Sequence, residues 1–163
     1  MGIFEVRGGK SLSGEITPQG AKNEALQIIS AVLLTDEEVI IKNIPDIIDV
    51  NLQIELLAEM QVKINRIDRH TCSFKADDVN VAYLSSKEFH KKSSRLRGSV
   101  MLAGPLLARF KKAFIPKPGG DKIGRRRLDT HIIGFEKLNA NFSYKEGEGY
   151  FTLQTPGLKG TYM

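Results

Sequence analysis

The sequence lacks the residues that several common classes of protein need. Its only cysteine is Cys72, which excludes an internal disulfide and a cysteine-rich zinc site. It has no tryptophan and 7% aromatic residues, which is little for a surface that stacks nucleic-acid bases. No apolar run reaches the roughly 18 residues of a membrane-spanning helix, and the N-terminus lacks the apolar stretch of a signal peptide. We therefore expect a cytoplasmic protein with no membrane partner.

Positive charge is what the sequence has in excess. It carries 24 Lys and Arg against 19 Asp and Glu, which gives a net charge of +5. This balance favours an anionic partner, either a nucleic acid or a phosphorylated small molecule. With 163 residues, 41% of them hydrophobic, the chain is long enough for one compact domain with a hydrophobic core.

The apolar pattern predicts a set of five elements in the first half of the chain. The run from 21 to 34 is apolar almost all round, as is typical of a helix buried on every side. Residues 3–16, which precede it, read as short strands broken by glycines. The five predicted elements are a helix over 21–34, a strand over 39–41, a helix from an N-cap at Asp49 to about Met60, and hairpin strands over 62–67 and 71–75.

The same order of elements recurs about 75 to 80 residues later, so that Lys22 corresponds to Arg97 and Asp49 to Asp129. A polar connection with a short strand at 79–83 separates the two sets, and residues 158–163 read as a turn entering a new strand. The second set is a helix over 96–108 kinked at Pro105, a strand over 113–115, a helix over 129–138, and hairpin strands over 142–144 and 150–153. The repeat predicts an α/β fold in which sheets pack around buried helices.

Cations stand at three predicted helix starts: Lys22, then Arg95 and Arg97, then the run 122–127. A helix N-terminus disfavours positive charge by roughly 0.3–1 kcal/mol and attracts anions through its free N–H groups. Three such sites suggest that an anionic ligand is the missing partner. The alternative is that each is a solvated surface charge.

The segment 116–127 combines three glycines with a run of arginines. Glycine lets the backbone approach a ligand closely, and the guanidinium group suits phosphate and carboxylate. The segment is not a Walker A loop, and by itself it could equally contact an RNA backbone. Within it, Asp121 is either a salt-bridge partner or a carboxyl group that transfers a proton.

The three histidines and the cysteine receive weaker assignments. We expect His70 and His90 to lie in polar turns and to be solvated. His131, just inside a predicted helix, either orients a loop or ligand or is structural. Cys72 lies at an apolar position of a predicted strand in which apolar and polar residues alternate, and we expect it in the core.

Four segments, in this order, resemble one family. They are residues 20–23 (GAKN), 96–99 (LRGS), 104–110 (GPLLARF) and 118–131 (PGGxxIGxRxxDxH, where x marks a position outside the motif). The sequence closely resembles the UDP-N-acetylglucosamine enolpyruvyl transferases (1-carboxyvinyltransferases), which are related to 5-enolpyruvylshikimate-3-phosphate synthase. The resemblance extends over essentially all 163 residues.

The resemblance implies two domains, each an inside-out α/β barrel of three helix-strand-helix-strand-strand units. This chain would be an incomplete domain with two of the three units. Residues 1–20 would be leading strands of the absent second domain, 21–95 the first unit, and 96–163 the second unit and the start of the third. The missing second domain of the same chain would be its partner, and the chain alone would be inactive.

The resemblance also implies a reaction. The enolpyruvyl group of phosphoenolpyruvate is transferred to the 3′-hydroxyl of UDP-N-acetylglucosamine by addition and then elimination of phosphate, with no metal and no cofactor. This is the first committed step of peptidoglycan (cell wall) synthesis, and it therefore bears on cell shape and division. By resemblance, phosphoenolpyruvate binds Lys22, Asn23 and Arg126, and the UDP-sugar faces Arg97, Arg126, Arg127, Leu128, Asp129 and Thr130.

Asp121 stands where most members of the family have the cysteine that donates a proton to the methylene of phosphoenolpyruvate. A carboxyl group donates only when protonated, and its usual pKa is about 3.9. The neighbouring cations should lower that pKa and bound phosphoenolpyruvate should raise it. We hypothesise that Asp121 becomes a competent acid once substrate is bound, and that this Asp form is insensitive to fosfomycin, which alkylates the cysteine. Arg127 stands where proline is common, which leaves the contacts to the sugar less defined.

The alternative function is a small basic RNA-binding module built on a repeated α/β unit. It would bind RNA in a strongly salt-dependent way. It is disfavoured because the basic residues fall at helix starts beside glycines, with few aromatic residues nearby.

Overall fold

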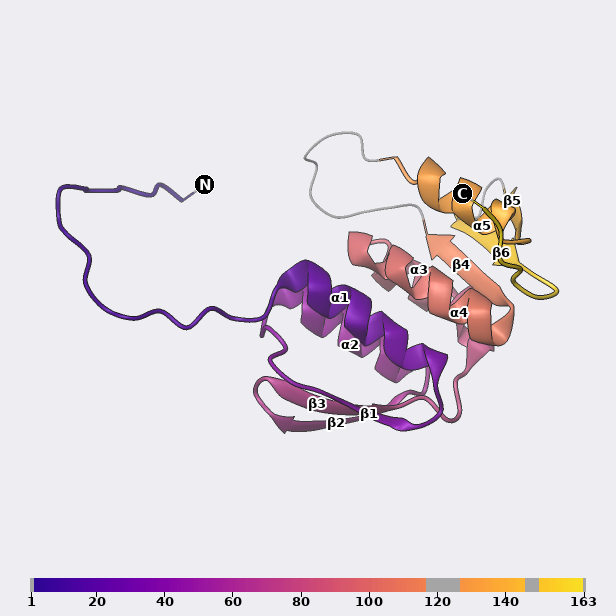
Figure 1. The fold of residues 1–163 in the computed structure, drawn as a ribbon, viewed down its shortest axis with the longest axis horizontal. Helices are drawn as coiled ribbons and strands as arrows, with labels where there is room; N and C mark the ends of the chain where they lie inside the picture. The colour runs from indigo at the N-terminus through magenta and orange to yellow at the C-terminus, as the bar shows by residue number, and fades with distance from the viewer. Residues whose placement is uncertain (1, 117–126, 146–149, 163) are drawn as a thin grey trace.

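The computed structural model describes residues 2–116, 127–145 and 150–162, and it contains two units of one topology (Figure 1). In the first unit, β1 and β2 flank β3, and both strands run antiparallel to it. α1 and α2 lie together against one face of this sheet (Figure 1). The elements of the first unit are α1 (Lys22–Ala31) with the 3₁₀ turn η1 (Val32–Leu34), β1 (Glu38–Ile41), α2 (Ile48–Glu59), β2 (Lys63–Asp68) and β3 (Thr71–Lys75).

The second unit repeats this arrangement, with β4 and β5 flanking β6 in an antiparallel sheet. The repeat predicted from the sequence is therefore confirmed in the element order and the strand order. The elements of the second unit are the 3₁₀ helix η3 (Arg97–Leu102), α4 (Ala103–Phe110), β4 (Lys112–Pro116), α5 (Asp129–Lys137), β5 (Asn141–Lys145) and β6 (Tyr150–Gln154).

Two details of the predicted helices are wrong. The helix expected over 96–108 is a 3₁₀ helix followed by an α-helix, and Pro105 lies in the first turn of α4 rather than at a kink. The first turn tolerates proline because its N–H groups have no partner within the helix. Asp49 is not the N-cap of α2, since Ile47 holds that position and Asp49 is the second helical residue.

α1 is not buried on every side, as its apolar sequence had suggested. Leu26 and Ile29 are buried in the core, but Ile28 is 44% exposed on the opposite face. In η1, Leu33 is buried whereas Leu34 is 54% exposed. An apolar residue on the surface is common, so composition alone could not tell which face of α1 is covered.

The connection between the units, residues 77–96, is helical, so the strand predicted at 79–83 is wrong. It forms the 3₁₀ helix η2 (Val81–Ser85) and the helix α3 (Lys87–Ser93). The side chain of Asn80 accepts a hydrogen bond from the N–H of Tyr83, and Ser86 accepts one from Phe89. These two caps satisfy N–H groups that a helix leaves free and start both helical segments.

α3 is fastened to the end of α2 by a polar cluster of Glu59, Tyr83 and Lys92. The Glu59 carboxylate is ion-paired with Lys92 and accepts a hydrogen bond of 2.5 Å from the Tyr83 hydroxyl. Burial tends to raise the pKa of Glu59, but the bonds from Lys92 and Tyr83 outweigh it and lower that pKa. Burial, together with the bond to Glu59, raises the pKa of Tyr83 to about 12.

The predictions for Cys72 and for two of the histidines have mixed outcomes. Cys72 is buried in β3, as expected. His90 does not lie in a polar turn, because it belongs to α3 and its ring stacks on Tyr150 with centroids 3.9 Å apart. His70 is half-buried, and its Nδ1 lies 2.9 Å from the carbonyl oxygen of Ile44.

The two units are joined side by side through α1, η3 and α4. The Arg109 guanidinium at the end of α4 donates to the carbonyl oxygens of Leu33, Thr35 and Ala76, at 3.2, 2.8 and 2.7 Å. These three bonds tie the second unit to the end of η1 and to the residue after β3. The strands of different units do not pair with one another in the part of the chain described.

The strands predicted at the two ends are not formed in the described residues. Residues 2–20 form an extended, exposed segment without a strand (Figure 1), and residues 158–162 also contain none. A strand needs a second strand to take up its N–H and C=O groups, and neither segment has one here. In the described ranges, no helix combines the length and apolar character needed to cross a membrane.

Candidate functional site

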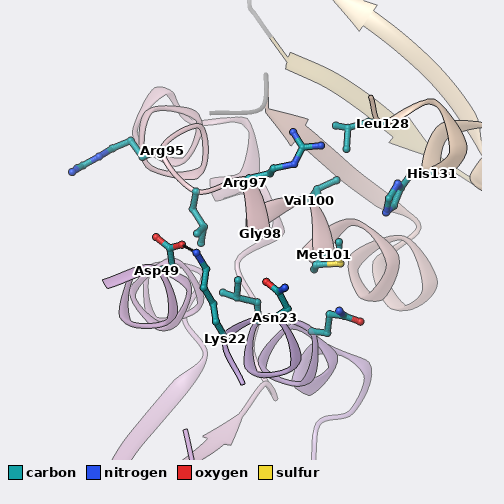
Figure 2. A pocket seen from close by; sticks show the side chains of 13 residues that line it. Lys22, Asn23, Asp49, Arg95, Arg97, Gly98, Val100, Met101, Leu128 and His131 are labelled. Atoms are coloured by element: carbon teal, nitrogen blue, oxygen red, sulfur yellow. Dashed lines mark ion pairs between the residues drawn. The ribbon is translucent and has the colours of Figure 1, made fainter. Parts of the chain in front are cut away.

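A cavity of about 480 Å³ opens where the helix starts of the two units meet (Figure 2). α1 and α2 form its lower side in Figure 2, η3 and the residues before it form a second side, and the start of α5 closes a third. The lining residues are Lys22, Asn23, Leu26, Gln27, Asp49, Arg95, Leu96, Arg97, Gly98, Val100, Met101, Leu128 and His131.

Lys22 and Asn23 occupy the first two positions of α1. The N-cap, Ala21, offers no side chain to the free N–H groups of the first turn, so these groups are available to an anion. Gly20 sets where the helix begins. A Cβ at this position would lie 2.0 Å from the carbonyl oxygen of Asn43, so only glycine lets the two segments approach this closely.

Asp49 is a residue of the cavity that the sequence analysis assigned only as a helix cap. Its carboxylate is ion-paired with Lys22 across the start of α2 (Figure 2). The Lys22 and Asp49 side chains are 48% and 37% exposed, so water screens the pair. The ion pair orients the ammonium group while leaving it accessible to a ligand. The repeat-equivalence of Asp49 and Asp129 was the signal that could have singled out this residue.

Arg97 is the first residue of η3 and reaches into the cavity (Figure 2). Leu96, which precedes it, is buried, and Gly98, which follows, packs directly on α1. A Cβ on Gly98 would lie 2.7 Å from a methyl carbon of Leu26. Arg95 also lines the cavity, but its guanidinium points away from Lys22 and Arg97 (Figure 2).

The residues predicted at the start of α5 divide into two groups. Leu128 is 9% exposed and lines the cavity. Arg127, Asp129 and Thr130 do not line it, and the Asp129 carboxylate is ion-paired with Arg127. Their assignment to the sugar nucleotide therefore stays a prediction.

His131 was left open between a structural and a ligand-orienting role. It is the third residue of α5, is exposed, and faces the cavity across from Arg97 (Figure 2). The predicted proton donor Asp121 and the predicted ligand Arg126 lie outside the described residues.

The charge of the cavity lining is positive. Among its described residues, three are basic, Lys22, Arg95 and Arg97, and one is acidic, Asp49. The start of α1 adds the positive end of a helix dipole. The arrangement suits a ligand with more than one negative charge. Over residues 2–116, 127–145 and 150–162, no three His, Cys, Asp or Glu side chains are grouped to hold a metal ion.

A family model described as EPSP synthase (3-phosphoshikimate 1-carboxyvinyltransferase) matches residues 6–163. Relatives named UDP-N-acetylglucosamine 1-carboxyvinyltransferase match over the whole chain: 57% identity in Porphyromonas gingivalis and 58% in Bacteroides thetaiotaomicron. A relative of the same name in Wolinella succinogenes is 38% identical over 161 residues. The chain spans 38% of the length of the first two relatives.

Two solved structures share the fold. The enolpyruvyl transferase NikO from Streptomyces tendae superimposes with a TM-score of 0.69 at 19% identity, over 93% of this chain and 32% of that one. An EPSP synthase from Acinetobacter baumannii gives a TM-score of 0.60 at 13% identity, over 91% and 33%. The expected enolpyruvyl transferase fold is confirmed, in the form of an incomplete domain.

Proposed function

The chain belongs to the EPSP synthase family, and we propose that it is the N-terminal part of a UDP-N-acetylglucosamine 1-carboxyvinyltransferase. The reaction would transfer the enolpyruvyl group of phosphoenolpyruvate to the 3′-hydroxyl of UDP-N-acetylglucosamine and release phosphate. It would occur in the cytoplasm and serve peptidoglycan synthesis. The support for this choice of substrates is the identity of 57–58% to relatives that carry this name.

The observation that carries the proposal is the shared cavity of Lys22, Asn23 and Arg97. Lys22 and Arg97 begin corresponding helices of the two units, and both line one cavity. The repeat thus supplies two cations to one site from two different backbones. Two anionic substrates that must meet at a single reacting centre need such an arrangement.

In the proposed reaction, the 3′-hydroxyl group gives up its proton to water as its oxygen bonds to the C2 carbon of phosphoenolpyruvate, and the methylene carbon of phosphoenolpyruvate gains a proton from an acid. The resulting tetrahedral ketal then loses phosphate, and the methyl group gives up a proton to restore the double bond. Lys22 holds the anionic groups of phosphoenolpyruvate and stabilises the charge that develops on the departing phosphate. Asp49 keeps the Lys22 ammonium oriented, and Arg97 holds the sugar nucleotide.

The rest of the site would come from segments beyond the cavity described above. We propose that Asp121 donates the proton to the methylene and Arg126 contacts both substrates. We also propose that residues 1–20 join the second domain, since their apolar side chains, such as Phe4 and Leu12, are almost fully exposed here. A complete site would therefore need the remaining part of the protein.

The test uses a fusion in which residues 1–163 replace the matched segment of the Porphyromonas gingivalis relative. Phosphate release is measured with phosphoenolpyruvate and UDP-N-acetylglucosamine. We expect turnover by the fusion, and a loss of about 100-fold or more in kcat/KM for Lys22→Ala, since a preorganised charge is removed. Lys87→Ala is the matched control, because Lys87 also begins a helix but lies outside the cavity; it should change the rate less than about twofold.

A well-folded fusion that releases no phosphate would contradict the proposal, as would equal losses for the two lysine variants. Tight, salt-sensitive binding of RNA by residues 1–163, without turnover by the fusion, would instead support the RNA-binding module.

Fosfomycin should leave the activity of the fusion intact, because Asp121 stands in place of the reactive cysteine. A stable adduct at this segment, with loss of activity, would contradict that part.

A further inference from the structure

We propose that Ser99 is a positioning residue for Arg97: its buried hydroxyl fixes the turn from which Arg97 reaches the sugar nucleotide. The inference rests on the proposed function in one respect, the identity of the ligand. Its structural basis is independent of that identity. Ser99 does not line the cavity, so it would act through Arg97 and not by touching substrate.

The Ser99 hydroxyl is the central contact of the turn that joins α3 to η3. Ser99 is 3% exposed, and its Oγ lies 2.8 Å from the carbonyl oxygen of Ser93 and 2.7 Å from that of Leu96. The single hydroxyl proton is thus shared between two acceptors on either side of the turn. Ser93 ends α3, whereas Leu96 directly precedes Arg97, so the hydroxyl sets the direction in which the chain leaves α3.

The backbone on both sides of Arg97 is held as well. Leu96 is 2% exposed, and its N–H donates to the carbonyl oxygen of Ser93 at 3.2 Å. Gly98 packs so closely on α1 that a Cβ there would lie 2.7 Å from a methyl carbon of Leu26, which would have to move. Arg97 therefore projects from a segment whose position is defined relative to both α3 and α1. The tie of α3 to α2 through Lys92 and Glu59 extends this support further.

The arginine side chain is long and flexible. A fixed backbone position therefore limits the conformational entropy that is lost when its guanidinium group binds a ligand. A shift of about 1 Å in the position of a binding group is enough to lower catalysis strongly. The carbonyl oxygens of Ser93 and Leu96 each keep a backbone N–H partner when the hydroxyl is removed. Replacing Ser99 with alanine should therefore leave no buried acceptor without a partner, and its effect should fall mainly on Arg97.

Ser93 provides a matched control in the same turn. Its hydroxyl is also buried, but it donates at 2.6 Å to the carbonyl oxygen of Phe89 within its own helix. Ser93→Ala thus removes a buried serine hydroxyl only six positions away without releasing the link across the turn. A general weakening of the fold would affect both variants alike, whereas a positioning role concerns Ser99 alone.

The experiment measures kcat and both KM values of the fusion protein for wild type, Ser99→Ala, Ser99→Thr and Ser93→Ala. We expect Ser99→Ala to raise KM for UDP-N-acetylglucosamine roughly fivefold, the size of one net hydrogen bond, and to leave KM for phosphoenolpyruvate unchanged. Ser99→Thr, which keeps the hydroxyl, should restore most of the affinity. Ser93→Ala should change neither KM more than about twofold. In an Arg97→Lys background, Ser99→Ala should have less than a twofold effect, because its action passes through Arg97.

An unchanged KM for the sugar nucleotide in Ser99→Ala, or an undiminished effect in the Arg97→Lys background, would overturn the inference. If Ser99→Ala fails to fold, Ser99→Cys, with its weaker donor, takes its place under the same criteria. If the wild-type fusion lacks turnover, the proposed function fails and amide exchange of residues 1–163 decides the positioning role. Exchange at Gly98 and Ser99 should then rise about tenfold in Ser99→Ala with α1 unaffected, and unchanged exchange would overturn it.

Discussion

The two units share one topology but differ in what covers the outer face of their sheets. In the first unit, Ile40 of β1 pairs with Ser73 of β3 on that face and is 56% exposed. At the corresponding place in the second unit, Phe114 of β4 pairs with Thr152 of β6 and is 4% exposed. The same strand order thus supports an open face in one unit and a buried face in the other.

The difference comes from the connection between the units. The His90 ring of α3 stacks on Tyr150 and meets Phe114 edge-on, at 3.9 and 5.9 Å between ring centroids. Phe89 and Tyr83 continue this aromatic cluster into η2. The inner faces of both sheets carry the residues that define the repeated fold. The outer face, in contrast, depends on whether a neighbouring segment lies over it.

The largest expected effect on stability tests this difference between the two outer sheet faces directly. Phe114→Ala should lower the free energy of unfolding by about 3–5 kcal/mol, because it leaves a cavity among aromatic rings. Ile40→Ala should cost less than about 1 kcal/mol, since its side chain is mostly in water. Urea unfolding of the 163-residue chain measures both. Losses of similar size would show that the two outer faces do not differ as described.

A smaller effect is expected where each unit brings backbone segments close together. In Gly20→Ala the new Cβ meets a backbone carbonyl oxygen, whereas in Gly98→Ala it meets the end of the flexible Leu26 side chain. We expect a loss of about 3 kcal/mol for the first and about 1 kcal/mol for the second. Gly134→Ala, in the open interior of α5, should stabilise the chain by roughly 0.5–1 kcal/mol. The reverse order in thermal unfolding would contradict this account of the two contacts.

The smallest effect concerns the cluster that attaches α3. Because the pKa of Glu59 is lowered in the folded chain, its contribution is present above the ordinary value of 4.5 and is lost as the pH falls below it. Glu59→Gln should therefore destabilise the chain by less than about 1 kcal/mol at pH 7, and the difference from wild type should shrink as the pH falls from 4.5 through the lowered pKa of Glu59. Glu55→Gln, exposed on the same helix, is the control. A difference that persists at low pH would contradict the role of the Glu59 charge.

The sequence predicted the elements whose apolar period was clear and whose ends carried turn residues. The strand at 39–41, the hairpin at 62–75 and the helix from Asp129 all form. The predictions failed where the local sequence is compatible with more than one secondary structure. Where a strand was predicted over 79–83, Asn80 caps a 3₁₀ helix that covers Val81–Ser85, and the segment 3–16 lacks a second strand to pair with.

The candidate site was predictable in part. Lys22, Asn23, Arg97 and Leu128 could be named from their motifs, and all four line one cavity. Asp49 was marked in the sequence only by its repeat equivalence to Asp129, and His131 only by its place in a predicted helix. The packing of α2 and α5 is what brings these two side chains to the cavity of Lys22 and Arg97. Ser99 looks unremarkable in the sequence, since its contacts to Ser93 and Leu96 depend on the path of the turn.

By itself the sequence determined the repeat, the positive charge and the placement of cations at helix starts, because these depend on residue type and spacing along the chain. Only the tertiary structure decided that Lys22 and Arg97 share a cavity, that Asp49 pairs with Lys22, and which sheet face is covered. These outcomes depend on contacts between residues far apart in the chain. Such contacts are fixed by how α1, η3 and α3 pack, and no local pattern encodes that packing.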